Sequence, residues 1–228
     1  MPPPQEDTTT NNTSSSHERI LQVATALFAK HGYHGTTMRA IAKAAGLTIS
    51  TVHYHIESKD KLYREVFRRQ FEVEYNRFAK VIRDAGDEVI YDPAAFRELA
   101  KNLMNVFVHR ALEAPESVRL WVNHWLERSE PEFKPDVEMS AEFSFPIFQM
   151  AIDQFERARQ AGTIHIEKIN FQMFIAGFIW INTGFFAGRS INVDGSRIDH
   201  TDPQILAIFD EFLNHYLDSM LNFREKSK

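Results

Sequence analysis

The stretch from Thr36 to His55 reads TTMRAIAKAAGLTISTVHYH, and its spacing predicts a short helix, a tight turn and a second short helix. In the first half, apolar residues recur at the i, i+3, i+4, i+7 spacing of one helix face: Met38, Ile41, Ala42 and Ala45. Thr37 is suited to cap this helix, because its hydroxyl can accept a backbone N–H. Gly46 stands where helices commonly end in a left-handed residue.

The second helix is predicted to begin after Thr48, which can cap it in the same way. Its apolar positions are Ile49, Val52 and Ile56. Two short helices joined by a glycine turn make a helix-turn-helix, whose second helix enters the major groove of DNA. From these residues alone, an ordinary helical hairpin with the same turn is the alternative.

The residues around the motif extend the pattern over residues 17–71. The positions that carry it are, in order, Ile20, Leu21, Ala24, Leu27, Phe28, Gly32, Tyr33, Thr36, Thr37, Ile41, Ala42, Ala45, Gly46, Thr51, Val52, Tyr54, Ser58, Lys59, Asp60, Lys61 and Leu62. In these residues and their spacing, the block resembles the DNA-binding domain of the TetR family of transcriptional regulators. It departs from the family at His53 to Ile56, where a tyrosine and then an aromatic pair are usual.

The resemblance implies an all-α fold of about nine helices. A three-helix helix-turn-helix domain, residues 17–76, would be followed by a helical bundle for effector binding and dimerisation, residues 77–228. Residues 1–16 offer almost nothing apolar to bury, so we expect a disordered tail and a first helix from His17. The apolar periodicity predicts a long helix over 59–85, and no strand alternation of useful length occurs.

Prolines mark the later helices, because proline is favoured in a first helical turn. Helices are predicted to start at Pro93, Pro115 and Pro203. A further helix over 140–161 is expected to be bent or interrupted at Pro146. The segments 129–139 and 188–202 are expected to be surface loops.

Residues 169–188 contain no charged side chain and are rich in phenylalanine. Twenty such residues could span a bilayer, but Asn170, Gln172, Asn182 and Thr183 would be costly in lipid. A helix that is apolar on nearly all sides can instead be buried in a bundle or at a subunit interface. The resemblance implies that residues 167–188 and 203–223 form a four-helix interface in a homodimer, with no membrane contact.

The motif positions also give the residues expected to contact DNA: Thr37, Arg39, Thr48, Ile49, Ser50, Thr51, His53, Tyr54, His55 and Lys59. The Arg39 guanidinium can hold guanine O6 and N7, and Ile49 or Thr51 can touch a thymine methyl group. Tyr54, His55 and Lys59 are expected to hold phosphate, which positions the protein without reading sequence.

An effector pocket is implied by the family. Its candidate residues are polar or aromatic side chains on the apolar helices: Asn105, His109, Trp121, His124, Trp125, Gln149, Phe178 and Asn182. A buried polar group needs a partner, and a ligand could be that partner. For each residue taken singly, ordinary core packing or a bond to backbone or water is the alternative.

Charge is unevenly distributed along the chain. Residues 17–70 carry nine Lys and Arg against four Asp and Glu, whereas residues 71–228 carry seventeen against twenty-five. A basic segment in an otherwise acidic chain is typical of a protein that binds the phosphates of DNA through one domain. With no cysteine, disulfides are excluded, and the absence of a secretory signal fits the cytoplasm.

The sequence gives no indication of an enzyme. It contains no phosphate-binding glycine loop, no nucleophile elbow and no His-Glu-x-x-His motif. The histidines lack metal-ligand spacing, so neither a metal nor a cofactor is expected. The sequence therefore predicts a regulator that binds a palindromic operator in double-stranded DNA, a repressor released by a small-molecule effector. The alternative is a DNA-binding activator or architectural protein without a small ligand.

Overall fold

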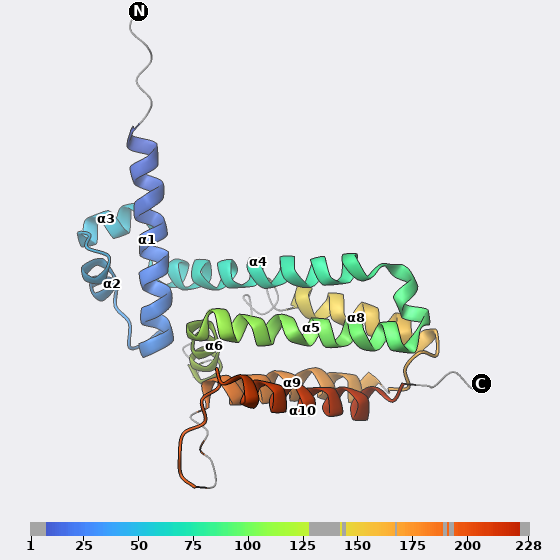
Figure 1. The fold of residues 1–228 in the computed structure, drawn as a ribbon. Helices are drawn as coiled ribbons and strands as arrows, with labels where there is room; N and C mark the ends of the chain where they lie inside the picture. Colours follow the sequence, from blue (N-terminus) through green and yellow to red (C-terminus); the bar gives the residue numbers. More distant parts are fainter. Residues whose placement is uncertain are drawn as a thin grey trace, which may run out of the picture. The chain divides into compact units, whose positions relative to one another are not determined.

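The computed structural model describes residues 8–127, 142, 145–166, 168–188, 191 and 194–223. Within these ranges the regular elements are nine α-helices and one 3₁₀ helix, and only two isolated β-bridges occur (Figure 1). The helices are α1 Thr8–His31, α2 Met38–Ala44, α3 Ile49–His55, α4 Lys59–Ala85, η1 Asp87–Tyr91, α5 Pro93–Glu113, α6 Pro115–Glu127, α8 Phe145–Gln160, α9 Lys168–Ala187 and α10 Pro203–Leu221. The all-α prediction is confirmed.

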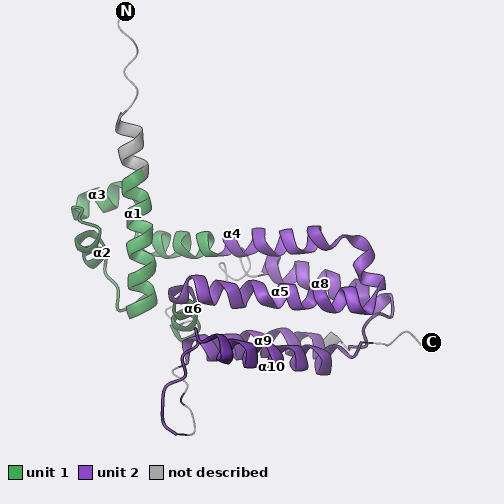
Figure 2. Ribbon diagram, in the orientation of Figure 1, with its two compact units in different colours: residues 1–70, 119–139 green, residues 71–118, 140–228 purple. Residues whose placement is uncertain are grey.

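The chain divides into two compact units (Figure 2). Unit 1 comprises residues 1–70 and 119–139, and unit 2 comprises residues 71–118 and 140–228. The sequence predicts a domain boundary between residues 76 and 77, and the two compact units divide within α4 after Gln70. The sequence does not predict that most of α6 joins the helix-turn-helix unit.

Unit 1 is built around the inward faces of α1, α2, α3 and the start of α4. Its fully buried side chains include Ile20, Phe28, Ile41, Val52 and Leu62. The first helix begins at Thr8, nine residues before the expected start at His17. No proline or glycine interrupts the segment from Thr8 to Ser16, so a helix fixed by the buried face beyond Ile20 can extend backwards.

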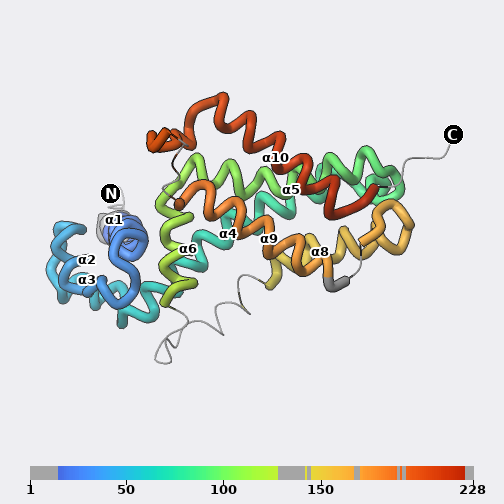
Figure 3. The backbone as a smooth tube through the Cα atoms, turned by 90° about the horizontal axis from the view of Figure 1, so that it is seen from below, coloured from blue at the N-terminus to red at the C-terminus, as the bar shows by residue number. Residues whose placement is uncertain are grey.

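Unit 2 is a bundle whose core is largely aromatic. Phe96 of α5 contacts Phe155 of α8 with ring centroids 5.3 Å apart, and Phe155 contacts Phe171 of α9 at 4.8 Å. Further along the same helices, Phe107 of α5 contacts Phe178 of α9 at 5.7 Å. Helices α5 and α9 therefore run in the same direction, and Figure 3 shows them side by side.

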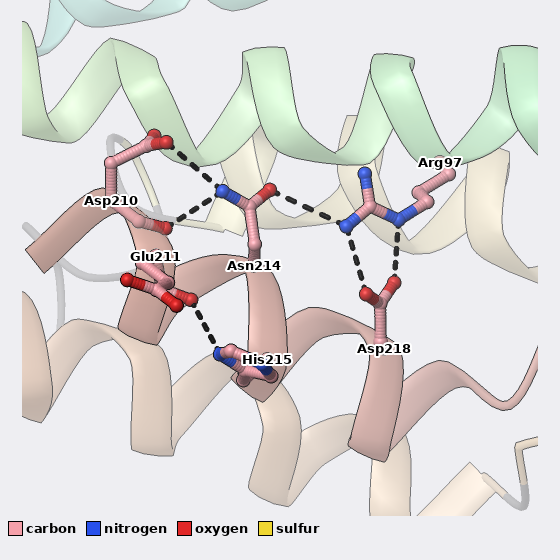
Figure 4. A network of polar contacts seen from close by, with 6 residues as sticks. All are labelled: Arg97, Asp210, Glu211, Asn214, His215 and Asp218. Carbon is pink, nitrogen blue, oxygen red and sulfur yellow. Dashed lines mark hydrogen bonds and ion pairs between the residues drawn. The ribbon is translucent and has the colours of Figure 1, made fainter. Parts of the chain in front are cut away.

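Polar contacts fix α10 against α5 (Figure 4). The Arg97 guanidinium donates two hydrogen bonds to the Asp218 carboxylate, and one of them measures 2.8 Å. One helical turn away, the Lys101 ammonium lies 3.3 Å from a carboxylate oxygen of Asp210, while Asn214 bridges Arg97 and Asp210. This network determines which face of α10 turns away from α5.

Two further expectations concern the segment around Pro146 and the loop before it. Helix α8 is not bent at Pro146: it begins at Phe145, so the proline lies in the first turn, where its missing N–H breaks no helical hydrogen bond. The loop predicted over 129–139 lies outside the described residues. Among the helices that the structure does describe, none is long and apolar enough to cross a membrane.

Candidate nucleic-acid interface

The turn between α2 and α3 has the geometry that its sequence predicts. Gly46 adopts φ +64°, its N–H bonds the carbonyl of Lys43, and the N–H of Leu47 bonds that of Ala42. This pair of bonds is the Schellman ending of a helix, in which the left-handed residue is usually glycine. The turn is thus set by local chemistry.

Both short helices are capped by threonine. The Thr37 hydroxyl oxygen accepts the Ala40 N–H at 3.1 Å, and that of Thr48 accepts the Thr51 N–H at 3.1 Å. The Thr48 hydroxyl also lies 2.8 Å from the Thr51 hydroxyl. These threonines therefore orient the two helices, and the Thr48–Thr51 contact would have to open before either hydroxyl could turn to a base.

The outer face of α3 carries exposed polar and aromatic groups. Val52 and Ile56 face inward, whereas Ser50, His53 and Tyr54 are exposed, Tyr54 to 80%. The Tyr54 ring lies edge-to-face against the His55 ring, with centroids 5.3 Å apart, and most of its surface remains exposed. Arg39 on α2 is also exposed, and Ile49 is half-buried at the start of α3.

The two histidines of α3 occupy different environments. His53 is exposed, with Nδ1 3.4 Å from the Glu57 carbonyl oxygen. His55 is half-buried, and its ring centroid lies 6.3 Å from that of His17, whose Nε2 in turn lies 3.1 Å from a Glu65 carboxylate oxygen. His55 is therefore packed against α1 rather than directed fully outward.

Lys59 does not extend into solvent as a phosphate-binding lysine would. Its ammonium donates hydrogen bonds to the carbonyls of Tyr33 at 3.0 Å and Thr36 at 3.2 Å, and it lies 4.0 Å from the centre of the Tyr33 ring. Desolvation lowers the pKa of Lys59, and the nearby Glu127 carboxylate partly opposes this. These contacts tie the Lys59 side chain to the α1–α2 connection, and its binding of phosphate stays a prediction.

The C-terminal part of α6 supports the same connection. The Glu127 carboxylate accepts the N–H groups of Tyr33 and His34, at 2.9 and 3.2 Å. The Asn123 amide donates to the carbonyls of Phe28 and Ala29, at 3.1 and 3.0 Å. These bonds fix the end of α1 and the residues just after it; the Phe28 carbonyl also accepts the Gly32 N–H at 2.9 Å. Sequence analysis gave no role to Glu127, because its partners lie more than ninety positions away along the chain.

The eight residues predicted to line an effector pocket are divided between the two units. His109 and Gln149 are exposed. Trp121, His124 and Trp125 belong to unit 1, where buried His124 lies 3.3 Å from the Tyr63 hydroxyl. Asn105 borders a small cleft between α5 and α10. Only Phe178 and Asn182 are buried within unit 2 on one helix, one turn apart. The pattern behind the prediction, a polar group on an apolar helix, does not specify which side of the helix is buried.

Comparison with known proteins agrees with this geometry. Residues 20–66 match the family profile of "Bacterial regulatory proteins, tetR family". This segment contains α2, α3 and the facing parts of α1 and α4. Residues 20–66 therefore carry the DNA-binding module of the TetR family, and the resemblance identified in the sequence is confirmed.

Curated relatives resemble the chain over part of its length. The transcriptional repressor KstR2 of Mycolicibacterium smegmatis is 31% identical over 68 residues, which are 30% of this chain and 33% of that protein. The repressor AcnR of Corynebacterium glutamicum is 31% identical over 120 residues, 48% of this chain and 57% of that protein. The chain thus matches between a third and about three-fifths of these relatives.

The similarity in fold covers more of the chain than the similarity in sequence. KstR2 of Mycobacterium tuberculosis gives a TM-score of 0.63 at 17% identity, covering 92% of this chain and 95% of that one. GusR of Salmonella enterica gives 0.65 at 19% identity, covering 91% and 96%. At these identities the likeness concerns the fold, and it extends to the helices that follow the family module.

Proposed function

We propose that this protein is a sequence-specific DNA-binding transcriptional regulator, a repressor that a small-molecule effector releases from a palindromic operator. The observation that carries the proposal is the capped α2–turn–α3 motif, whose outer face exposes Arg39, Ser50, His53 and Tyr54 on a basic segment of the chain. An α-helix placed in the major groove with such side chains can bind both base edges and phosphates.

A selection of genomic DNA fragments by the full-length protein tests this function. We expect enrichment of a two-fold symmetric sequence, with half-sites about one helical turn apart. Arg39→Ala and Tyr54→Ala should abolish or relax the enrichment, whereas Lys80→Ala, an exposed cation of unit 2, should leave it unchanged. If no sequence is enriched, or if both site variants select the same sequence as the wild type, the proposal is wrong.

The homodimer proposed here uses α9 and α10. Both helices expose large apolar side chains: Met173 and Trp180 on α9, and Ile208 and Phe212 on α10. Each pair is spaced so that its members share a helix face. Exposed apolar groups gathered on neighbouring helices are typical of an interaction surface. A two-fold contact between copies would also supply the two recognition helices that a palindrome needs.

Release by an effector requires a path from unit 2 to the helix-turn-helix, and α6 supplies a continuous one. The helix begins at Pro115 in unit 2 and ends at Glu127 in unit 1. Its last turns hold the end of α1 through Asn123 and Glu127. A displacement of α6 would therefore move or release the connection that orients α2 and shift the population toward a state that does not fit DNA.

The α6 mechanism is tested separately from DNA binding itself. Asn123→Leu and Glu127→Gln should lower operator affinity without changing the selected sequence, because they loosen the module but leave its outer face intact. Arg119→Gln, an exposed change on the same helix, is the control. A variant pair that binds the operator as tightly as the wild type would exclude this path.

A further inference from the structure

Unit 2 contains three polar side chains at one level of its aromatic core. Phe107 of α5 contacts Phe178 of α9, and it also contacts Phe78 of α4 with ring centroids 5.2 Å apart. Helix α4 runs opposite to α5, since η1 reverses the chain between them, whereas α9 runs parallel to α5 (Figures 1 and 3). These three phenylalanines define an aromatic layer.

The neighbouring layer follows from helix geometry, since one turn takes 3.6 residues. Glu74 comes four residues before Phe78, and Asn182 comes four after Phe178. With α4 antiparallel to the other two helices, both displacements lead toward the same end of the bundle. Arg110, three residues after Phe107, lies at this level, and its charge acts on the Glu74 carboxyl group.

Two members of this layer are almost completely enclosed. Glu74 is 4% exposed and Asn182 is 6% exposed. The Asn182 side-chain oxygen is buried and has no hydrogen-bond partner among the described residues. A buried acceptor without a donor is unfavourable by about 1–3 kcal/mol in general, so a bound molecule that brings a donor to this oxygen would gain that free energy.

We propose that this layer binds a small organic amine, whose ammonium group donates to the Asn182 oxygen and the Glu74 carboxylate while its apolar body packs on Phe78, Phe107 and Phe178. The inference rests on the proposed function, because this amine would be the effector. An ammonium group has donors for both acceptors, and aromatic faces attract cations. A carboxylate ligand would be repelled by the Glu74 carboxylate and would offer no donor to Asn182.

The test uses three probes that share a phenylethyl body: 2-phenylethylamine, 2-phenylethanol and 3-phenylpropanoate. Each is titrated into the full-length protein, and binding is followed by thermal unfolding and by calorimetry. We expect the amine to raise the unfolding temperature most, and the alcohol less. No shift with the amine up to its solubility, or a larger shift with 3-phenylpropanoate, would overturn the proposal.

Two variants with matched controls locate the amine. Glu74→Gln should weaken the amine by about tenfold or more and leave the alcohol unchanged, because it removes only the charge-assisted bond. Asn182→Leu should weaken the binding of both the amine and the alcohol. The controls are Glu72→Gln and Asn170→Leu, which change exposed residues of the same helices. If the controls weaken binding as much as the site variants, the amine binds elsewhere and the assignment is wrong.

The experiments distinguish a failure of the amine proposal from a failure of the proposed function. A protein that selects an operator but binds no amine would remove this proposal and leave the regulator intact. A protein that binds the amine through Glu74 and Asn182 but selects no DNA would remove the proposed function and leave the ligand site. In a protein that does both, the amine should lower operator affinity in the wild type and not in Glu74→Gln.

Discussion

Glu74 combines deep burial with an ionisable group. Desolvation raises its pKa to about 7, although Arg110 and Arg77 both act in the opposite direction. In the unfolded chain its pKa is near the ordinary value of 4.5. Between these two values the folded state binds more protons than the unfolded state, so stability falls as the pH rises and is lowest above the folded-state pKa.

We therefore predict that Glu74→Gln stabilises the protein at alkaline pH. The gain should be on the order of 3 kcal/mol above pH 7 and should fade as the pH falls toward 4.5. Urea unfolding at a series of pH values measures it. Glu72→Gln, on the exposed side of α4, should reproduce the wild-type pH profile. Equal pH profiles for Glu74→Gln and the wild type would mean that this carboxyl titrates normally.

The residues that sequence analysis placed correctly are those whose partners are near in the chain. The caps at Thr37 and Thr48 and the left-handed Gly46 depend on groups within three positions. Lys59 was expected on phosphate, yet its ammonium bonds carbonyls 23 and 26 positions earlier. No local pattern shows that contact, because it depends on how α4 packs against α1.

The Tyr216 side chain of α10 packs against α9 beside Gly177. The Tyr216 hydroxyl donates to the Phe174 carbonyl at 2.7 Å, and the Tyr216 ring stacks on that of Phe174 with centroids 5.5 Å apart. A Cβ atom on Gly177 would lie 2.4 Å from the Tyr216 hydroxyl oxygen but 3.4 Å from the ring carbon that bears it. The clash would therefore be with the oxygen alone.

We predict that Gly177→Ala destabilises the protein by about 1–3 kcal/mol, as overpacking usually does. Tyr216→Phe alone should cost about 1 kcal/mol through the lost hydrogen bond. In the double variant the two losses should not add, because removing the hydroxyl makes room for the methyl group. Chemical denaturation of the four proteins gives this coupling. Additive losses would show that the hydroxyl is not the obstacle.

At the scale of elements, the sequence predicted best where a helix has a clear start or stop. The ends of α4 at Lys59 and Ala85, and the start of α5 after the Asp92 cap, agree with prediction. The starts of α1 and α8 do not, because the apolar periodicity of α1 begins only at Ile20 and Pro146 was interpreted as an interruption instead of part of a first turn. The residues predicted to bind the effector fall in both units for a related reason. Periodicity identifies an apolar helix but not the helices that pack against it.

The whole molecule is proposed to act as a dimer, and its exposed apolar residues allow a direct test. Phe178, although on α9, is buried in the core of unit 2, so its replacement would report on folding. Trp180 and Phe212 are 63% and 49% exposed. We predict that Trp180→Arg combined with Phe212→Arg gives a folded monomer in sedimentation experiments, with weaker operator binding. Ser219→Arg, also exposed on α10, is the control. A double variant that remains dimeric would exclude this interface.

The distribution of charge over the whole chain leads to the last prediction. The segment 17–70 is basic and the remainder acidic, so salt should weaken operator binding by screening one module. Arg39 is exposed, whereas the Lys59 ammonium is already bonded to two carbonyls. Arg39→Gln should therefore make the logarithmic dependence of affinity on salt shallower by about one per protomer.

Lys59→Met should lower the affinity at every salt concentration but leave that dependence nearly unchanged, because it loosens the α1–α2 connection without removing a phosphate contact. Operator affinity measured across a salt series for the three proteins separates these effects. A shallower dependence for Lys59→Met would mean that its side chain leaves the carbonyls of Tyr33 and Thr36 and turns to phosphate when DNA binds.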